Sequence, residues 1–133
     1  MPIRVSIDHF NRLVIGVGDG VLTIPDLVGF SLEVLRANVV HYGKIIDVAA
    51  SHPDFSKAEL LAFAQVVRET RSDAPRGPVA LVVDPKRGDL AKVFIGLQMG
   101  GRRAEVFQSI HDARRWLAVE IRKQEGAGDP WRS

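Results

Sequence analysis

The sequence contains no cysteine among its 133 residues. Disulfide bridges, a thiolate nucleophile and sulfur-ligated zinc or iron–sulfur centres are therefore excluded. The chain also has no apolar run near the ~20 residues that a membrane-spanning helix needs. Its first residues do not combine a charged start with a long apolar segment, as a secretion signal would. We therefore expect a soluble cytoplasmic protein.

Residues that bind metals or nucleotides are also scarce. The four histidines are His9, His41, His52 and His111. They show no metal-ligand spacing, so we expect neither a metal nor another cofactor. The glycine fingerprint of a dinucleotide-binding loop is incomplete, because Val21 occupies the position of its third glycine. We interpret Gly18-Asp19-Gly20 as a turn.

The chain has no dense run of charge of one sign, although its charge is unevenly distributed. The first 66 residues carry five basic and seven acidic side chains, whereas the remainder carries thirteen and nine. The basic half would suit an anionic partner. Its arginines include two separate pairs, Arg102-Arg103 and Arg114-Arg115, without interleaved aromatic residues. We therefore expect no binding to nucleic acid.

The composition is that of an ordinary globular domain, with 46% apolar and 26% charged residues. A chain of this length can bury about two thirds of its unfolded surface in one domain. We expect a single domain over residues 1–123. Residues 124–133 contain Gly126, Gly128 and Pro130, and are expected to form a disordered tail.

The most informative stretch runs from Gly43 to Arg71. It starts with an apolar run interrupted once, by Asp47, which predicts a strand covered on both faces. Ser56 and Glu59 then have the spacing of a capping box, which predicts that a helix begins there. The predicted core positions of this helix are Leu60, Phe63, Ala64 and Val67.

Similar patterns divide the rest of the chain. Apolar runs predict strands near residues 3–7, 13–17, 79–83 and 102–107. Capping and turn residues predict helices over about 23–43, over 89–98 and from Ser109 onward. The first helix is expected to end near His41, whose side chain would favour the negative helix end. Its predicted core positions are Leu27, Phe30, Val34 and Leu35.

The order of elements is ββαβαβαβα. Strands that alternate with helices indicate an α/β fold with a parallel sheet and right-handed crossovers. We expect a mixed, mostly parallel five-stranded sheet with four helices, in which the first strand forms an antiparallel edge.

This pattern resembles the SpoIIAA-like proteins of the STAS/SEC14-related group. The resemblance runs from about Val14 to Leu117. It rests on the turn followed by Val21-Leu22-Thr23 and Asp26, the strand ending in Asp47, the strand Val79 to Val83, and Val106-Phe107 leading to Ala113 and Trp116-Leu117. The resemblance implies a non-enzymatic regulatory or ligand-binding domain. Sporulation and stress-response relatives antagonise anti-sigma factors, and relatives on the SEC14 side bind lipids.

The resemblance also implies a candidate phosphosite. In anti-sigma-factor antagonists, a serine in an Asp-Ser-Ser-Gly motif at a helix start is phosphorylated by the partner kinase. The matching segment here is Asp54-Phe55-Ser56-Lys57, which keeps Asp54 and Ser56 but replaces the first serine and the glycine. A phosphate on Ser56 would face the helix amides. The simpler interpretation is that Ser56 acts only as a helix cap.

The helix expected over 89–98 carries little charge, which is typical of a helix that is buried or contacts something apolar. One hypothesis is that it closes an apolar cavity or touches a membrane surface. The ligand would be small, apolar or lipid-like, with an anionic end. The alternatives are packing against the sheet, a homodimer interface and a contact with another protein partner.

The candidate ligand-binding residues fall into three groups. Aromatic and aliphatic side chains would line the cavity, and basic residues, including Arg102 and Arg103, would attract the anionic head group. Carboxylates would lie where two neighbouring parallel strands end, which is where ligands bind in such sheets. The candidates are Phe94, Leu97, Trp116, Lys86, Arg87, Asp47 and Asp84.

A small hydrolase-like enzyme is the third interpretation. It would use Asp47 and Asp84 in one cleft. Ser51 and His52 lie near Asp54 in sequence, but no Gly-x-Ser-x-Gly elbow accompanies them. We therefore assign no catalytic residue and expect a protein that is not an enzyme.

Overall fold

The computed structural model describes residues 3–69, 77–87 and 104–128. The strands in these ranges are β1 (Ile3–Asp8), β2 (Leu13–Leu22), β3 (Gly43–Pro53), β4 (Val79–Val82) and β5 (Ala104–Phe107). The helices are α1 (Ile24–Arg36), α2 (Lys57–Glu69) and α4 (Ile110–Gly128), with a short 3-10 helix η1 (Pro85–Arg87). The helix expected over 89–98 lies outside the described residues. The expected α/β class is confirmed.

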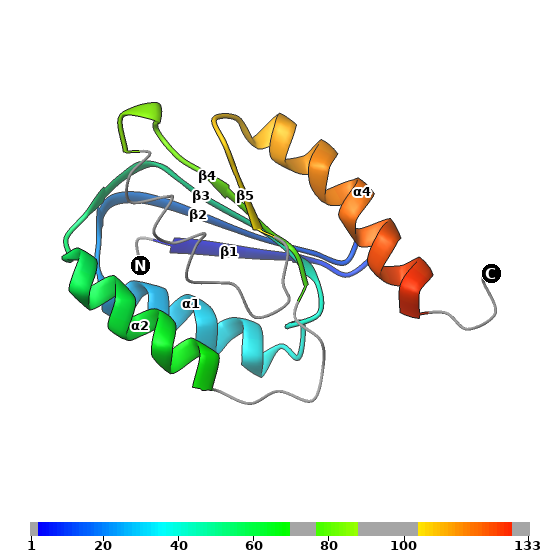
Figure 1. The fold of residues 1–133 in the computed structure, drawn as a ribbon, viewed down its shortest axis with the longest axis horizontal. Helices are drawn as coiled ribbons and strands as arrows, with labels where there is room; N and C mark the ends of the chain where they lie inside the picture. The colour runs from blue at the N-terminus through cyan, green and yellow to red at the C-terminus, as the bar shows by residue number, and fades with distance from the viewer. Residues whose placement is uncertain (1–2, 70–76, 88–103, 129–133) are drawn as a thin grey trace.

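The five strands lie in one sheet in the order in which they occur along the chain, β1-β2-β3-β4-β5. β1 is antiparallel to β2, and the other neighbours are parallel, as predicted. Right-handed crossovers that step repeatedly in one direction leave their helices on one face. α1 and α2 accordingly lie side by side on one face of the sheet, and α4 covers the other (Figure 1).

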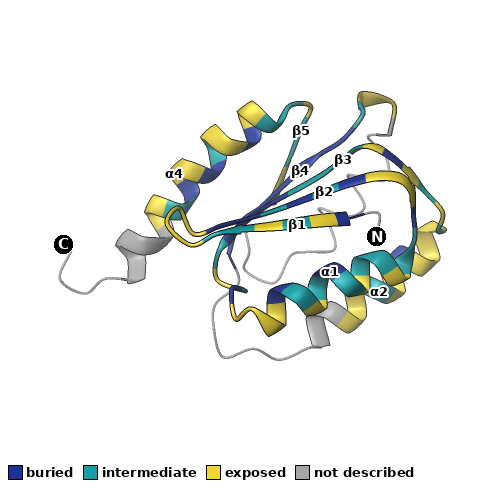
Figure 2. Cartoon of the chain, turned by 180° about the vertical axis from the view of Figure 1, so that it is seen from behind, coloured by how far each residue is buried: buried dark blue, intermediate teal, exposed yellow. Residues whose placement is uncertain are grey.

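The core has two main parts, one on each face of the sheet. On the α1 side it includes Val14, Phe30 and Val34, and on the α4 side it includes Ile45, Ala113 and Leu117. All four residues of β4 are buried, which fits the continuous apolar run that predicted an interior strand. Figure 2 shows burial concentrated in the strands, whereas much of the outward side of α4 is exposed.

Local capping determines where the helices begin. Thr23 and Asp26 form a complete capping box at the start of α1. Ser56 and Glu59 form another at α2, with the Glu59 amide 3.1 Å from the Ser56 hydroxyl and the Ser56 amide 3.0 Å from the Glu59 carboxylate. The Ser109 hydroxyl accepts a hydrogen bond from the Asp112 amide at α4. All three predicted starts are therefore confirmed.

The predicted end of α1 near His41 is wrong. The helix ends at Arg36, and Asn38 adopts the left-handed conformation with a φ of 60°. The Val39 amide donates to the carbonyl oxygen of Val34, and the Asn38 amide donates to that of Leu35. This is a Schellman motif in which Asn takes the usual place of Gly. His41 therefore lies in the following loop and does not cap the helix.

The interpretation of Gly18-Asp19-Gly20 as a turn is also wrong, because β2 continues through all three residues to Leu22. Val17 pairs with Asp47, and Asp19 pairs with Ala50, so β3 contains one extra residue at this point. A bulge of this kind bends the strand locally. Gly20 has a φ of 69°, which suits glycine in this irregular segment.

The helix α4 continues to Gly128, beyond the expected domain boundary at residue 123. The expected tail is therefore helical over residues 124–128. Gln124, Glu125 and Ala127 are good helix formers, and one intervening glycine costs only about 1 kcal/mol relative to alanine. Residues 129–133 lie outside the described part of the chain.

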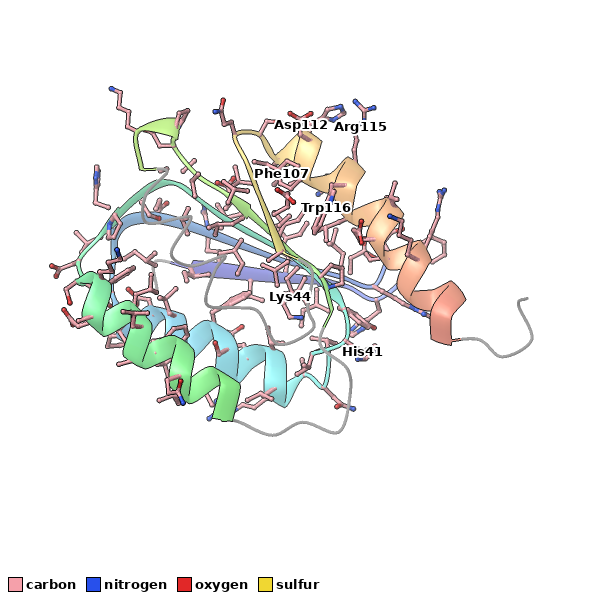
Figure 3. The ribbon with its side chains drawn as sticks, in the orientation of Figure 1. His41, Lys44, Phe107, Asp112, Arg115 and Trp116 are labelled. Atoms are coloured by element: carbon pink, nitrogen blue, oxygen red, sulfur yellow. The ribbon has the colours of Figure 1, made fainter. Side chains whose placement is uncertain are left out.

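The loops at the N-terminal ends of β3 and β4 are joined by backbone hydrogen bonds, and a buried lysine fixes the first of them. Lys44 is 6% exposed, and its ammonium group donates to the carbonyl oxygens of Val40 and Tyr42. The Val40 carbonyl also accepts a hydrogen bond from the Gly77 amide. Figure 3 shows Lys44 and His41 at the same end of the sheet. These bonds hold the segment after α1 against the start of β4.

Candidate functional site

An apolar groove lies between α1 and α2, on the side of the molecule opposite α4. We call it the α1–α2 groove. Its volume is about 420 Å³, within the range of roughly 300–1,000 Å³ that is common for ligand pockets. The residues that line it are Ile24, Val28, Ser31, Leu32 and Leu35 from α1, and Glu59, Ala62, Phe63 and Val66 from α2.

The groove exists because α1 has two apolar sides. One side carries Phe30 and Val34, which are buried in the core. The other carries Ile24, Val28 and Leu32 at four-residue spacing, so that these side chains follow one another along the same side. This second row faces α2 and not the sheet. The sheet thus covers only part of the apolar surface of α1.

The side chains along the groove remain accessible to solvent. Val28 is 40% exposed, Leu32 41%, and Val66 on α2 61%. Leu35, predicted to belong to the core, is 38% exposed, so that prediction is wrong. Its side chain lines the groove because it lies with Leu32 on the α2 side of α1. These apolar side chains are thus gathered in one groove and are not scattered over the surface.

The two ends of the groove differ in charge. At the N-terminal end, the carboxylates of Asp26 and Glu59 are held in the two capping boxes. At the C-terminal end, α1 finishes with Arg36, which is exposed and makes no ion pair within the described ranges. Arg36 does not line the groove itself, but it follows Leu32 by four residues and so lies one turn beyond the apolar row on the same side of α1.

Trp116 lies far from this groove, although the sequence suggested it as a pocket residue. It is half-buried on α4, and its ring centroid is 5.7 Å from that of Phe107 on β5. Figure 3 shows both rings on the α4 side of the sheet. The contact supports the packing of α4 onto β5. Phe94 and Leu97, the other predicted apolar contacts, lie outside the described residues.

The prediction that Asp47 ends its strand is wrong, because β3 continues for six more residues to Pro53. Its carboxylate accepts a hydrogen bond from the Ala49 amide at 3.2 Å, at the bulge in β3. Asp84 follows the last residues of β4, and its carboxylate accepts a hydrogen bond from the Lys86 amide at 3.0 Å. Each carboxylate therefore stabilises its own segment of backbone.

The register also separates the two carboxylates. Asp47 pairs with Val82, so Asp84 lies two residues further along the sheet, roughly 7 Å at the usual rise of a strand. Lys86 and Arg87 belong to η1, directly after Asp84. None of these four candidates lines the α1–α2 groove. These four residues are thus not part of the groove.

Ser56 lies where the sequence predicted, at the start of α2, and it is exposed. Its capping partner Glu59 also lines the groove. Within the described ranges, no group of three His, Asp or Glu side chains has an arrangement suited to a metal ion. None of the helices described here is both long enough and apolar enough to cross a membrane.

The chain was compared with protein families, curated proteins and solved structures, and nothing in any of the three comparisons matches it. The geometry of the groove therefore carries the functional argument.

The groove was not predicted, although the sequence contains a signal for it. α1 carries apolar residues at two interleaved sets of positions, of which only one was assigned to the core. The second set, Ile24, Val28 and Leu32, is too regular to be scattered surface residues. A helix with apolar residues on two sides needs a second covering surface.

Proposed function

We propose that this chain is a cytoplasmic, non-enzymatic binding domain of SpoIIAA-like architecture, whose α1–α2 groove holds the apolar part of a small ligand with an anionic end. The observation that carries the proposal is the row of solvent-accessible aliphatic side chains along the groove, led by Val28 and Leu32. Burial of apolar area contributes about 25 cal/mol per Å², so covering this row is favourable.

The sequential strand order, with α1 and α2 on one face, supports the SpoIIAA-like part of the proposal. A fourth helix over residues 89–98 belongs to the same proposal. The local bonds of Asp47 and Asp84 favour a structural role for both carboxylates over catalysis. A binding domain needs the groove but no catalytic carboxylates.

The test compares two leucine variants. Leu32 lines the groove and Leu61 does not, yet both are 41% exposed, which makes Leu61→Asp a matched control for Leu32→Asp. Decanoate is titrated into each protein and followed by amide NMR shifts. We expect saturable shifts at α1 and α2, about tenfold weaker binding in Leu32→Asp from the loss of roughly 1.4 kcal/mol of apolar contact, and no change in Leu61→Asp.

Equal binding by both variants, or no saturable shift in the wild-type protein, would contradict the proposal. Sedimentation of the same proteins tests the main competitor. A wild-type dimer that dissociates in Leu32→Asp and takes up no decanoate would make the groove an interface between two copies of the chain, and the ligand proposal would be wrong.

A second candidate function is a phospho-regulated interaction module of the anti-sigma-factor-antagonist type. The exposed position of Ser56 at the start of α2 favours it, because its hydroxyl is accessible to a kinase. Intact-mass spectrometry of the protein purified from its own cells tests this candidate. The candidate function requires an increase in mass by one phosphate group that survives denaturation and is absent from Ser56→Ala.

A further inference from the structure

We infer that Arg36 binds the anionic head group of the ligand, so that the α1–α2 groove takes a single-chain amphiphile in one orientation only. This inference rests on the proposed function. The head group would lie at the C-terminal end of α1, and the alkyl chain would run along Leu32 and Val28 toward Ile24.

The N-terminal end of the groove is unsuited to an anion. Helix N-termini attract anions through their unpaired amides, and both α1 and α2 begin at this end. Here the amides of Asp26 and Glu59 are already bonded to the hydroxyls of Thr23 and Ser56. The carboxylates of Asp26 and Glu59 add two negative charges at the same place. An anionic head group would therefore be repelled by two carboxylates, and one amide at each helix start is no longer free to bind it.

The C-terminal end offers the opposite conditions. Arg36 is exposed, and within the described ranges its guanidinium makes no ion pair. The side chain of a helical residue leans back over the preceding turn, so we expect Arg36 to extend over the turn that carries Leu32. A guanidinium presents paired N–H donors that match a carboxylate or a phosphate.

The negative end of the α1 macrodipole opposes an anion at this position, but its effect is limited. The carbonyl oxygens of Glu33, Val34 and Leu35 all accept backbone hydrogen bonds in the turn that closes the helix. The Arg36 charge therefore acts beside carbonyl groups that are already satisfied. The full positive charge of Arg36, on the last turn of α1, offsets the roughly half-unit of negative charge at the C-terminus of each helix.

The experiment uses two probes with the same alkyl chain, decanoate and decyltrimethylammonium, below their micelle concentrations. Each is titrated calorimetrically into the wild-type protein, Arg36→Gln and Lys57→Gln. Lys57 is the matched control, because it is an exposed cation at the other end of the helix pair, on the Leu61 side of α2. The wild-type protein should prefer decanoate to the cationic probe.

Arg36→Gln should weaken decanoate binding about three- to fivefold, as expected for one exposed ion pair, and leave the cationic probe unaffected or bound more tightly. Lys57→Gln should change neither. If both probes bind equally and Arg36→Gln matches the wild-type protein, the inference about Arg36 is wrong while alkyl binding in the groove stands. If neither probe binds, the proposed function itself fails, and the inference fails with it.

Discussion

The ammonium nitrogen of Lys44 lies 2.6 Å from the carbonyl oxygen of Val40, so a buried cation fastens the loop that follows α1 to the beginning of β3. The same carbonyl accepts the Gly77 amide, and this segment is therefore joined to the residues that precede β4. The Lys44 side chain thus fixes the connection before β3, and backbone hydrogen bonds join that connection to the one before β4.

Replacing Lys44 with Met should lower the free energy of unfolding by about 1.5–3 kcal/mol, because the hydrogen bonds that are lost come from a charged group. Urea denaturation followed by circular dichroism measures the change. Lys57→Met, at an exposed position on α2, should stay within about 0.5 kcal/mol of the wild-type protein. Equal stability of the two variants would show that the Lys44 bonds contribute nothing net.

Gly77→Ala should be among the most destabilising single substitutions in the chain. A Cβ atom at this position would overlap the carbonyl oxygen of Tyr42 and lie 2.6 Å from that of His41. Backbone atoms cannot move aside as a flexible side chain can, so we expect a loss of about 3 kcal/mol or more.

Gly20→Ala provides the comparison, because Gly20 has a positive φ but open space around it. It should lose only about 1–2 kcal/mol from backbone strain. Thermal unfolding of both variants measures which of them loses more stability. If Gly20→Ala proves the more damaging, the close approach of Gly77 to the loop carbonyls is wrong.

The Asp8 carboxylate should respond to substitution of Asn11. The Asn11 side chain donates to Asp8 at 2.7 Å and its backbone amide donates at 3.0 Å, and these bonds lower the pKa of Asp8 below its ordinary value of 3.8. In Asn11→Ala the larger of these effects is lost, so the pKa should rise toward 3.8. Carbon-detected NMR of the Asp8 carboxyl during a pH titration measures it.

The direction of this pKa shift determines how Asp8 makes the free energy of unfolding depend on pH. Because the pKa of Asp8 is lower in the folded than in the unfolded protein, its stabilising contribution is present above about pH 4. The contribution disappears as the pH falls through the lowered folded-state value. Arg114→Gln should move the pKa much less, since the charge of Arg114 is the smallest cause of the shift. A larger effect from Arg114 than from Asn11 would contradict this assignment.

Asp47→Ala should destabilise the sheet by about 1 kcal/mol, because the Ala49 amide at the bulge would lose its side-chain acceptor. Asp47→Asn retains an oxygen that can accept the same bond and should restore most of the stability. Chemical denaturation of the two variants separates the hydrogen bond from the charge. If Asn is as damaging as Ala, the negative charge of Asp47 is what matters.

The features that the sequence predicted correctly depend on residues close together in the chain. Ser56 and Glu59 satisfy each other's backbone and side-chain groups within a single turn, whatever the rest of the fold does. The end of α1 was harder to predict from the sequence. Asn38 takes the place of Gly in a left-handed cap, and this shows only in the hydrogen bonds of the Schellman motif. For this reason the predicted end of the helix, near His41, lies several residues beyond the actual end at Arg36.

The failed predictions depend on partners distant in the sequence. Gly18-Asp19-Gly20 has turn composition, but pairing with β3 on one side and, at Gly18, with β1 on the other holds the segment extended. The extra residue in β3 likewise follows from that pairing, and so the local role of Asp47 could not be deduced from its apolar neighbours. Register is set by tertiary contacts that no short window contains.

The candidate site shows the same limit. Periodicity identified Phe30 and Val34 as core residues, which is correct, and it also assigned Leu35 to the core. Val34 and Leu35 are adjacent in sequence and lie about 100° apart around the helix axis, yet Val34 faces the sheet and Leu35 faces the groove. Only the position of α2 relative to α1 decides between these environments.

The sequential strand order has a consequence for how the chain is made. Each new strand joins the sheet at its growing edge, and none has to be inserted between two strands already in place. The first half of the chain, through β3, already contains the apolar residues that pack under α1. Because folding units form from the N-terminus during synthesis, this layer can be assembled on the ribosome before the residues of α4 emerge. The last helix then closes a sheet whose opposite side is already packed.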